Sequence, residues 1–340
     1  MHKLNVLIAG STGYIGIQLV KLLSKHKNTN IKYLCGSSSV GKSIDFFDKS
    51  LINKKLPKIQ KFDKNFLKHV DLVFTALPNG QAQKLSNSLL KNNKLIDLSA
   101  DFRLKTAKQY LKWYNIKHNS PKNINKSIYA LSEFSKKNIK KFKIISCPGC
   151  YPTSILLPLK PLIKKKLIKT KGIVIDSKSG YSGAGRGVHK KYKNKNLYES
   201  LSAYGVGFHR HNSEIEQELN KYSKTKVKFN FTPHLTPMFK GILSTIYVDI
   251  VPKSSASKIH NFLSSYYNKD KFIKILKLNS MISTNDVINT NNCYISVCKT
   301  KYKNKIIILS AIDNLIKGGA GQGVQNMNMI YDFKYDEGLK

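Results

Sequence analysis

The sequence has little arginine and few acidic residues. Arginine occurs only at positions 103, 186 and 210, and aspartate and glutamate together number 19, against 59 lysines and arginines in 340 residues. The resulting formal charge of +40 is of the size that normally indicates nucleic acid or an anionic membrane as a partner. However, the lysines are spread along the whole chain, with no basic tail and no interleaved aromatic residues. We therefore expect a solvated lysine surface and no nucleic-acid footprint.

Long hydrophobic runs are also missing. No apolar segment approaches the roughly 20 residues that a membrane span requires, so we expect a soluble protein with no membrane partner. The opening "MHKLNVLIAG" resembles a first strand running into a glycine loop, not a targeting signal, and this favours a cytoplasmic location. A chain of 340 residues is long enough for two domains.

Cysteine is too sparse for a disulfide framework. The five cysteines are an odd number and widely scattered, so reduced thiols are expected. Cys147 and Cys150 form a C-P-G-C motif that could be half of a zinc site or a redox pair. No second C-x-x-C or H-x₃-H follows, and Cys293 and Cys298 have four residues between them in an apparent strand. We expect no metal, although a redox pair and a plain buried cysteine remain alternatives.

The N-terminal segment predicts a dinucleotide site. The apolar run Leu4–Ala9 is typical of a buried parallel strand, and it is followed by a glycine loop and a helical pattern. Strand, glycine turn and helix N-terminus are what a pyrophosphate site needs, although the spacing here is G-x-x-G-x-x-G and a glycine-rich turn of another α/β protein would look similar. The predicted cofactor residues of this loop are Gly10, Ser11, Thr12, Gly13, Tyr14 and Ile15.

The second predicted strand, 31–39, carries no acidic residue for a ribose 2′-hydroxyl. It ends instead in serines, among them Ser37 and Ser38, and Lys42 follows. Hydroxyls and a cation suit a 2′-phosphate, so NADP is the predicted cofactor. Further strands at 70–78 and 94–103, with helical patterns between them, predict a doubly wound parallel sheet of the α/β class through about residue 149.

Cys150 is the predicted nucleophile. It follows the strand 142–146 and a Pro-Gly turn, and Pro152 fits the first turn of a helix. A helix N-terminus stabilises a thiolate and presents N–H groups to an oxyanion. Cys147 lies at the strand end and lacks this advantage.

A base is available in the segment "FHRHNSEIEQEL". Ser213-x-x-Glu216 has the pattern of a capping box, which would place His209 and His211 in the loop before a helix. Histidine is suited to take the thiol proton and to return a proton later, and Glu214 could orient either ring. The alternative is that the histidines only stabilise the loop.

Several motifs, in order along nearly the whole chain, resemble the N-acetyl-γ-glutamyl-phosphate reductase family of arginine biosynthesis. They are "GSTGYIG", "ALPNG", "LSADFRL", "YALSEF", "PGCYPT", "DSKSGYSGAGRG", "HRHNSEI", "PHLTPMFKGILSTIYV" and "NLIKGGAGQGVQNMN". The resemblance implies a Rossmann-type NADP domain, 1–149 with 313–340, and an α+β catalytic and dimerisation domain of the semialdehyde-dehydrogenase type, 150–312. It also implies a homodimer or homotetramer.

By the same resemblance, the enzyme reduces N-acetyl-glutamyl 5-phosphate with NADPH through a thioester on Cys150, assisted by His209, His211 and Glu214. The family pattern adds Pro78, Gly183 and Asn314 to the cofactor residues. Each arginine lies in a family motif, and the predicted substrate residues are Arg103, Ser179, Gly180, Arg186 and Arg210.

The sequence departs from the family at two positions near these motifs. Cys147 stands where asparagine is usual, and Asn79 where histidine is usual. Two related activities remain alternatives: aspartate-semialdehyde dehydrogenase, and a reductase of a carrier-protein-bound acyl phosphate. A lysine-rich nucleic-acid-binding protein is a more remote one.

Overall fold

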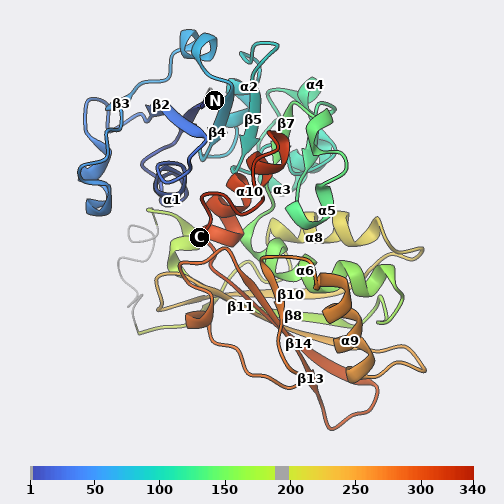
Figure 1. Ribbon diagram of the computed structural model, residues 1–340. Helices are drawn as coiled ribbons and strands as arrows, with labels where there is room; N and C mark the ends of the chain where they lie inside the picture. The colour runs from blue at the N-terminus through green and yellow to red at the C-terminus, as the bar shows by residue number, and fades with distance from the viewer. Residues whose placement is uncertain (1–2, 188–198) are drawn as a thin grey trace. The chain divides into compact units, whose positions relative to one another are not determined.

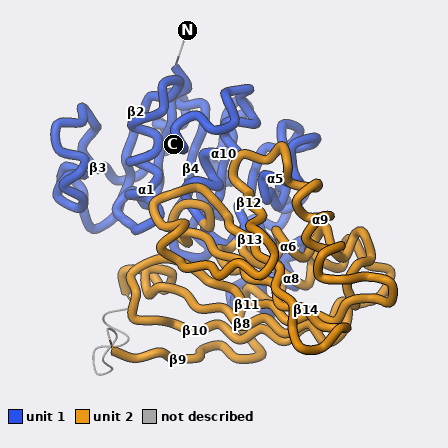
Figure 2. Tube along the Cα trace, turned by 60° about the horizontal axis from the view of Figure 1, so that its bottom comes forward, with its two compact units in different colours: residues 1–148, 319–340 blue, residues 149–318 orange. Residues whose placement is uncertain are grey.

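The computed structural model describes residues 3–187 and 199–340, and the chain divides into two compact units (Figure 2). Unit 1 comprises residues 1–148 and 319–340, and unit 2 comprises residues 149–318. The return to unit 1 is later than the predicted border at 313, because Asn314 bonds to unit 2. Its carboxamide donates to the Ser182 hydroxyl and accepts from the Gly241 N–H. No helix within the described ranges is long and apolar enough to cross a membrane.

Unit 1 is built on a seven-stranded parallel sheet, which confirms the predicted doubly wound α/β class (Figure 1). Strand β1 lies between β2 and β4, so the strand order reverses beside it. The central strands are apolar on both faces, as a sheet covered on both sides requires. In spatial order the strands are β3 Ile59–Gln60, β2 Thr29–Cys35, β1 Leu4–Ala9, β4 Leu72–Thr75, β5 Lys94–Asp97, β7 Ile144–Ser146 and β6 Ser127–Tyr129.

The helices of unit 1 include one from the far end of the chain. Helix α10 has a polar sequence but is buried, because its amides are hydrogen-bonded: Asn326 donates to the Ala130 carbonyl and accepts from the Ser132 hydroxyl. The C-terminal segment is thereby fixed to the sheet domain. The helices are α1 Tyr14–Leu23, α2 Gln81–Ser86, α3 Ala107–Tyr114, α4 Pro121–Ile124, α5 Ser132–Ser135 and α10 Gly321–Ile330, with 3₁₀ turns η1 Ile44–Phe46, η2 Lys49–Leu51, η3 Lys64–His69 and η4 Ile139–Lys141.

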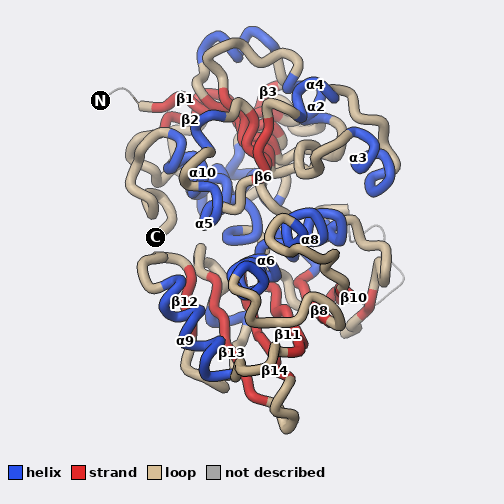
Figure 3. Tube along the Cα trace, turned by 90° about the vertical axis from the view of Figure 1, so that its right-hand side faces the viewer, coloured by secondary structure: helices blue, strands red, loops and turns tan. Residues whose placement is uncertain are grey.

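Unit 2 contains a seven-stranded mixed sheet, mostly antiparallel (Figure 3). In spatial order its strands are β12 Ile273–Ile275, β13 Cys293–Lys299, β14 Lys305–Ile312, β11 Ile242–Asp249, β8 Ile173–Gly180, β10 Phe229–Thr236 and β9 Ser202–Ala203. Its helices are α6 Cys150–Lys164, α8 His211–Asn220 and α9 Ala256–Tyr267, and its 3₁₀ turns are η5 Tyr181–Ala184 and η6 Thr284–Asp286. A π-helical turn, η7 Ile316–Ala320, spans the border between the units.

Helix α6 forms the core of unit 2 despite two internal prolines, Pro158 and Pro161. Proline has no N–H, so Pro161 leaves the Leu157 carbonyl without its helical donor. The Tyr267 hydroxyl on α9 donates to that carbonyl at 2.6 Å. A neighbouring helix thus replaces the hydrogen bond that Pro161 removes from α6.

Candidate active site

Cys150 is the first residue of α6, as the sequence predicted. Gly149 precedes it in an extended conformation (φ −66°, ψ 158°), and the Cys150 side chain is partly exposed. The first N–H groups of a helix have no carbonyl partner within the helix, so the start of α6 can stabilise negative charge. Cys147 is buried, and burial raises the pKa of its thiol to about 12. Of the two, only Cys150 has the surroundings of a nucleophile.

Glu214 connects the residue before the nucleophile with a histidine. One oxygen of its fully buried carboxylate accepts the Gly149 N–H at 2.9 Å, and the other lies 3.8 Å from His211 Nε2. The His211 ring lies against the Cα of Gly149, where an added Cβ would come within 2.7 Å of Cε1. The structure thus brings His211 and Glu214 to the start of α6.

Two glycines contact His211 and Cys150, and the sequence analysis did not predict either glycine as a site residue. Gly149 makes room for the His211 ring, and a Cβ on Gly318 would lie 2.7 Å from the Cβ of Cys150. Gly318 arrives from the far end of unit 2, so nothing local predicts the contact. The only signal was its place in the motif "NLIKGGAG".

His209 has a different environment from His211. Its ring is surrounded by the rings of Tyr151, Tyr204 and Phe231, at centroid distances of 5.7, 5.5 and 5.6 Å. Its Nδ1 accepts the backbone N–H of His211 at 3.2 Å. Burial, and secondarily the charge of Arg210, lower the pKa of His209 to about 4. His209 is therefore a neutral ring at neutral pH, held in place by aromatic contacts.

The predicted capping box at Ser213 is wrong. Helix α8 begins at His211, with Arg210 as its N-cap residue. The Ser213 hydroxyl donates to the Arg210 carbonyl at 2.6 Å and does not cap an N–H, while Glu216 pairs with Lys226. His211 is thus part of the helix and not of the loop, so the helix backbone fixes the direction of its side chain.

The predicted substrate residues have unequal surroundings. Arg103, in unit 1, is buried and donates Nε to the Cys147 carbonyl at 2.9 Å and Nη2 to the Leu98 carbonyl at 3.3 Å. Arg186 and Arg210 are exposed. Ser179 and Gly180 end strand β8 and are buried. A Cβ on Gly180 would lie 2.6 Å from the backbone of Lys240, so the glycine is needed for this close approach.

Two predicted cofactor residues, Gly183 and Asn314, lie together in unit 2. A Cβ on Gly183 would lie 3.7 Å from the Asn314 amide nitrogen, and 3.1 Å from the Ser179 hydroxyl. Because the Asn314 carboxamide also bonds Ser182 and Gly241, it ties turn η5 to the start of β11. These two bonds hold the turn that contains Gly183.

The predicted cofactor loop lies at the carboxyl edge of the unit 1 sheet, between β1 and α1. Gly10 has φ +86°, and a Cβ there would collide with the Ala76 carbonyl. Gly13 is the N-cap of α1, which starts with Tyr14 and Ile15, so the helix N-terminus is open to a phosphate. Ser11 is buried and Thr12 half-buried. These residues fit a dinucleotide.

The predicted 2′-phosphate residues are on the surface after β2. Ser37, Ser38 and Lys42 are exposed, and the Lys42 ammonium lies 4.4 Å above the Phe46 ring. Pro78, after β4, is also exposed.

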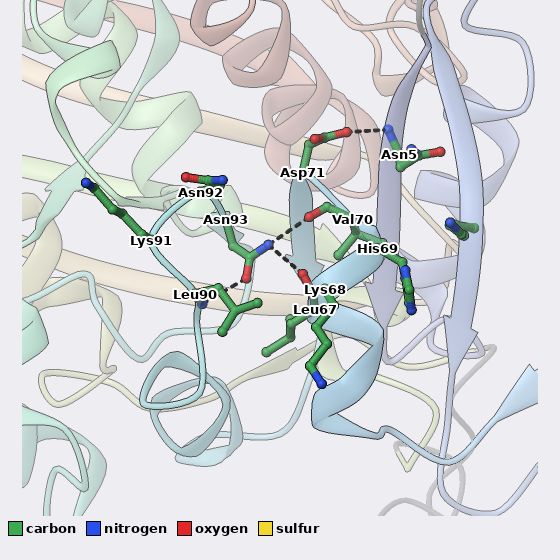
Figure 4. Close-up of a pocket in the computed structure, with 11 residues that line it drawn as sticks. Asn5, Leu67, Lys68, His69, Val70, Asp71, Leu90, Lys91, Asn92 and Asn93 are labelled. Atoms are coloured by element: carbon green, nitrogen blue, oxygen red, sulfur yellow. Dashed lines mark hydrogen bonds between the residues drawn. The ribbon is translucent and has the colours of Figure 1, made fainter.

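A cavity of about 480 Å³ opens at the opposite, amino edge of the same sheet (Figure 4). None of the predicted site residues lines it. Two of the polar side chains that line it form hydrogen bonds to the protein backbone. Asn93 donates to the Leu67 and Val70 carbonyls, and Asp71 accepts the Asn5 N–H. It is not the catalytic centre. Among the described residues, no group of histidine, cysteine and carboxylate side chains could hold a metal ion.

Comparisons with known proteins show the family of the chain. Residues 5–142 match the family model "Semialdehyde dehydrogenase, NAD binding domain", and residues 150–314 match "Semialdehyde dehydrogenase, dimerisation domain". The chain is 41% identical over 337 residues to an N-acetyl-gamma-glutamyl-phosphate reductase from Clostridium botulinum, covering 99% of this chain and 98% of that protein.

Solved structures share the fold at low sequence identity. An aspartate semialdehyde dehydrogenase II from Vibrio cholerae, complexed with ASA, superposes with a TM-score of 0.74 at 17% identity, covering 98% of this chain and 99% of the other. An aspartate semialdehyde dehydrogenase from Candida albicans, solved with NADP, has a TM-score of 0.67 at 19% identity, covering 97% and 98%. At such identities the likeness establishes the fold alone.

Proposed function

Because the chain belongs to the N-acetyl-γ-glutamyl-phosphate reductase family of semialdehyde dehydrogenases, we propose that it reduces N-acetyl-glutamyl 5-phosphate, with Cys150 as the nucleophile. The products are N-acetylglutamate 5-semialdehyde and phosphate, and the pathway is arginine biosynthesis. The observation that carries the proposal is the position of Cys150 at the start of α6, with His211 and Glu214 held against the preceding residue.

The chemistry begins with a thiolate. Cys150 Sγ attacks the acyl carbon. The bond between this carbon and the phosphate oxygen breaks, and phosphate leaves with the bonding electron pair, so that a thioester on Cys150 remains. When bound, NADPH supplies the hydride that reduces this acyl group. The Cys150–carbon bond then breaks to release the aldehyde. Each stage places negative charge on the same oxygen, which the N–H groups at the start of α6 can stabilise.

His211 is the base in this proposal. Its ring touches the residue before Cys150, and Glu214 faces its Nε2. The carboxylate stabilises the imidazolium that forms when the ring takes the thiol proton, and the ring later returns a proton to the oxyanion. His209 is a positioning residue, because it is neutral, enclosed by aromatic rings, and bonded to the His211 backbone.

NADP is the proposed cofactor. Gly10 to Ile15 would hold the pyrophosphate, and Ser37, Ser38 and Lys42 would contact the 2′-phosphate. The segment 36–42 has hydroxyls and a lysine but no carboxylate to repel that phosphate. We expect kcat/KM to be at least roughly tenfold higher with NADPH than with NADH, the difference expected from one charged hydrogen bond. Equal values for the two cofactors would contradict this assignment.

The protein is proposed to be a homo-oligomer, a dimer or a tetramer. Unit 2 matches a dimerisation domain, and its sheet exposes neighbouring apolar side chains. Val174 and Tyr247 are register partners on β8 and β11 and are 39% and 44% exposed. We place the second copy on this face and expect Tyr247→Glu to lower the molar mass measured by light scattering.

The five free cysteines suit a reducing compartment, and we propose that the protein is located in the cytoplasm.

The reverse reaction provides the first test. NADPH formation is followed at 340 nm from N-acetylglutamate 5-semialdehyde, NADP and phosphate, for wild type, Cys150→Ser and Cys147→Ser. We expect only Cys150→Ser to abolish turnover. Loss of turnover in Cys147→Ser alone would overturn the assignment of the nucleophile.

The same assay separates the related substrates. A wild-type enzyme that oxidises aspartate semialdehyde or a carrier-bound aldehyde, and not N-acetylglutamate 5-semialdehyde, would leave the thioester mechanism intact and refute the substrate.

A further inference from the structure

Helix α8 carries two buried acidic side chains one turn apart, Glu214 and Glu218, and both bond to α6 or to the residue just before it. The two helices lie side by side in unit 2 (Figure 3). The whole chain has only 19 aspartates and glutamates. That two of them are fully buried between the same pair of helices calls for a physical explanation.

The bond nearer the start of the two helices, called the upper bond, lies at the proposed active site. Glu214 accepts the N–H of Gly149, directly before the nucleophile. The lower bond is an ion pair between Glu218 and Lys160, at 3.1 Å, with side chains 3% and 4% exposed. Glu218 also pairs with Lys221, the residue that follows the last turn of α8, and the Lys160 ammonium lies 5.1 Å from the Tyr222 ring.

Stability alone is a poor explanation for the lower bond. Desolvation makes a buried ion pair about as favourable as well-packed apolar side chains, or less so. Burial lowers the pKa of Lys160, although Glu218 offsets part of the effect. What an ion pair does provide is geometry, since charged hydrogen bonds at two levels oppose both sliding and rotation of one helix against the other.

We infer that Lys160 and Glu218 are positioning residues that hold α6 and α8 in one register and thereby keep Cys150 and His211 in working geometry. This rests on the proposed function of Cys150 and His211. The nucleophile lies at the start of α6 and the base at the start of α8. A shift between the helices therefore changes the distance between the two reacting groups directly, and a misplacement of about 1 Å can cost roughly 100-fold in rate.

The test compares single variants with an apolar replacement of the whole pair. Lys160→Met and Glu218→Gln each leave one buried partner behind, and both are expected to lower the Tm and kcat. The double variant Lys160→Met/Glu218→Met leaves no charge behind at these two positions, and we expect it to recover most of the Tm. Its kcat should nevertheless stay at least roughly tenfold below wild type, with KM within about twofold.

Helix α8 offers a matched control. Glu216 and Lys226 form an ion pair at 2.9 Å whose side chains are 36% and 69% exposed. Glu216→Gln/Lys226→Met removes one negative charge from α8 and one positive charge from the segment that follows it, both more exposed than the buried pair, and should leave Tm and kcat unchanged. A folded double variant at Lys160 and Glu218 with wild-type kcat would overturn the inference, whatever its Tm.

Two further measurements keep the result decisive. If the double variant does not fold, Glu218→Asp takes its place, because it keeps the charges and shortens the link by one methylene. A roughly tenfold lower kcat in a folded Glu218→Asp protein is expected, and an unchanged kcat overturns the inference.

The pH profile of iodoacetamide labelling at Cys150, read by peptide mass spectrometry, should move to higher pH in the variants of Lys160 and Glu218.

The labelling needs no substrate, so it separates this inference from the proposed activity. An unchanged labelling profile in the variants refutes the positioning role even if the substrate is confirmed. A shifted profile supports that role even if the enzyme acts on a different aldehyde.

Discussion

The imidazole of His211 lies directly against the Cα of Gly149, the residue that precedes Cys150. Gly149 has ordinary extended dihedral angles (φ −66°, ψ 158°), which any residue adopts. The glycine is therefore needed for the space it leaves and not for its backbone freedom.

Gly149→Ala should move His211 away from Cys150. The new methyl group would overlap the ring, and we expect kcat to fall roughly 100-fold, as for a displacement of about 1 Å. Steady-state kinetics and the Tm test this. Gly187→Ala is the matched control, because a Cβ there meets no atom within 4 Å. A kcat within about twofold of wild type in Gly149→Ala would show that the contact has no catalytic consequence.

Gly318→Ala should act on the nucleophile from the other side. An added Cβ would lie 2.7 Å from the Cys150 Cβ, closer than side-chain atoms tolerate, so the thiol must shift. We expect slower iodoacetamide labelling of Cys150 and at least a roughly tenfold loss of kcat. Wild-type labelling and turnover together would contradict the contact.

His209→Asn should reduce the acid sensitivity of the protein. The pKa of His209 is about 4 in the folded state against 6.5 for an ordinary histidine, so between these values the unfolded chain binds more protons. The contribution of His209 to the free energy of unfolding is fully present above pH 6.5 and is lost as the pH falls toward 4. At pH 5 about 2 kcal/mol of it is lost. Asparagine can still accept the His211 N–H, but it does not titrate.

Urea denaturation at pH 7.5 and pH 5 measures this difference. The fall in free energy of unfolding between the two pH values should be smaller in His209→Asn by up to about 2 kcal/mol. His69→Asn, at an exposed position, is the control. Equal falls in His209→Asn and wild type would show that His209 is protonated in the folded protein at pH 5.

Arg103→Lys should cost both stability and activity. Arg103 holds the Cys147 and Leu98 carbonyls with two different nitrogens, and a lysine has only one. Losing one charged hydrogen bond costs about 1.5–3 kcal/mol, so the Tm should fall. If Arg103 also binds the substrate anion, kcat/KM falls roughly tenfold or more.

Arg210→Lys separates the two effects. Arg210 is exposed, so the Tm should be unchanged while kcat/KM falls by a similar factor. Unchanged kinetics in both variants would refute the binding of the substrate anion by these arginines.

Much of the fold follows from local patterns. Apolar runs and glycine turns predicted strands that begin within a few residues of β1, β2, β4, β5 and β7 of the unit 1 sheet, because a buried parallel strand must be apolar on both faces. The short strands β3 and β6 were not predicted. The parallel sheet was confirmed, and so was the family that the ordered motifs indicated. The start of α8 was wrong because a serine followed by glutamate resembles a capping box, whereas the Ser213 hydroxyl bonds back to Arg210.

The sequence by itself determined the two-domain α/β architecture, the nucleophile candidate Cys150 and the presence of two histidines. Only the tertiary structure distinguished those histidines, because burial among Tyr151, Tyr204 and Phe231 makes His209 neutral, while Gly149 admits the His211 ring. It alone brought Gly318 to Cys150, and Glu218 to Lys160. Propensity and pattern act over a few neighbouring residues, whereas these contacts join distant segments that meet only when the chain has packed.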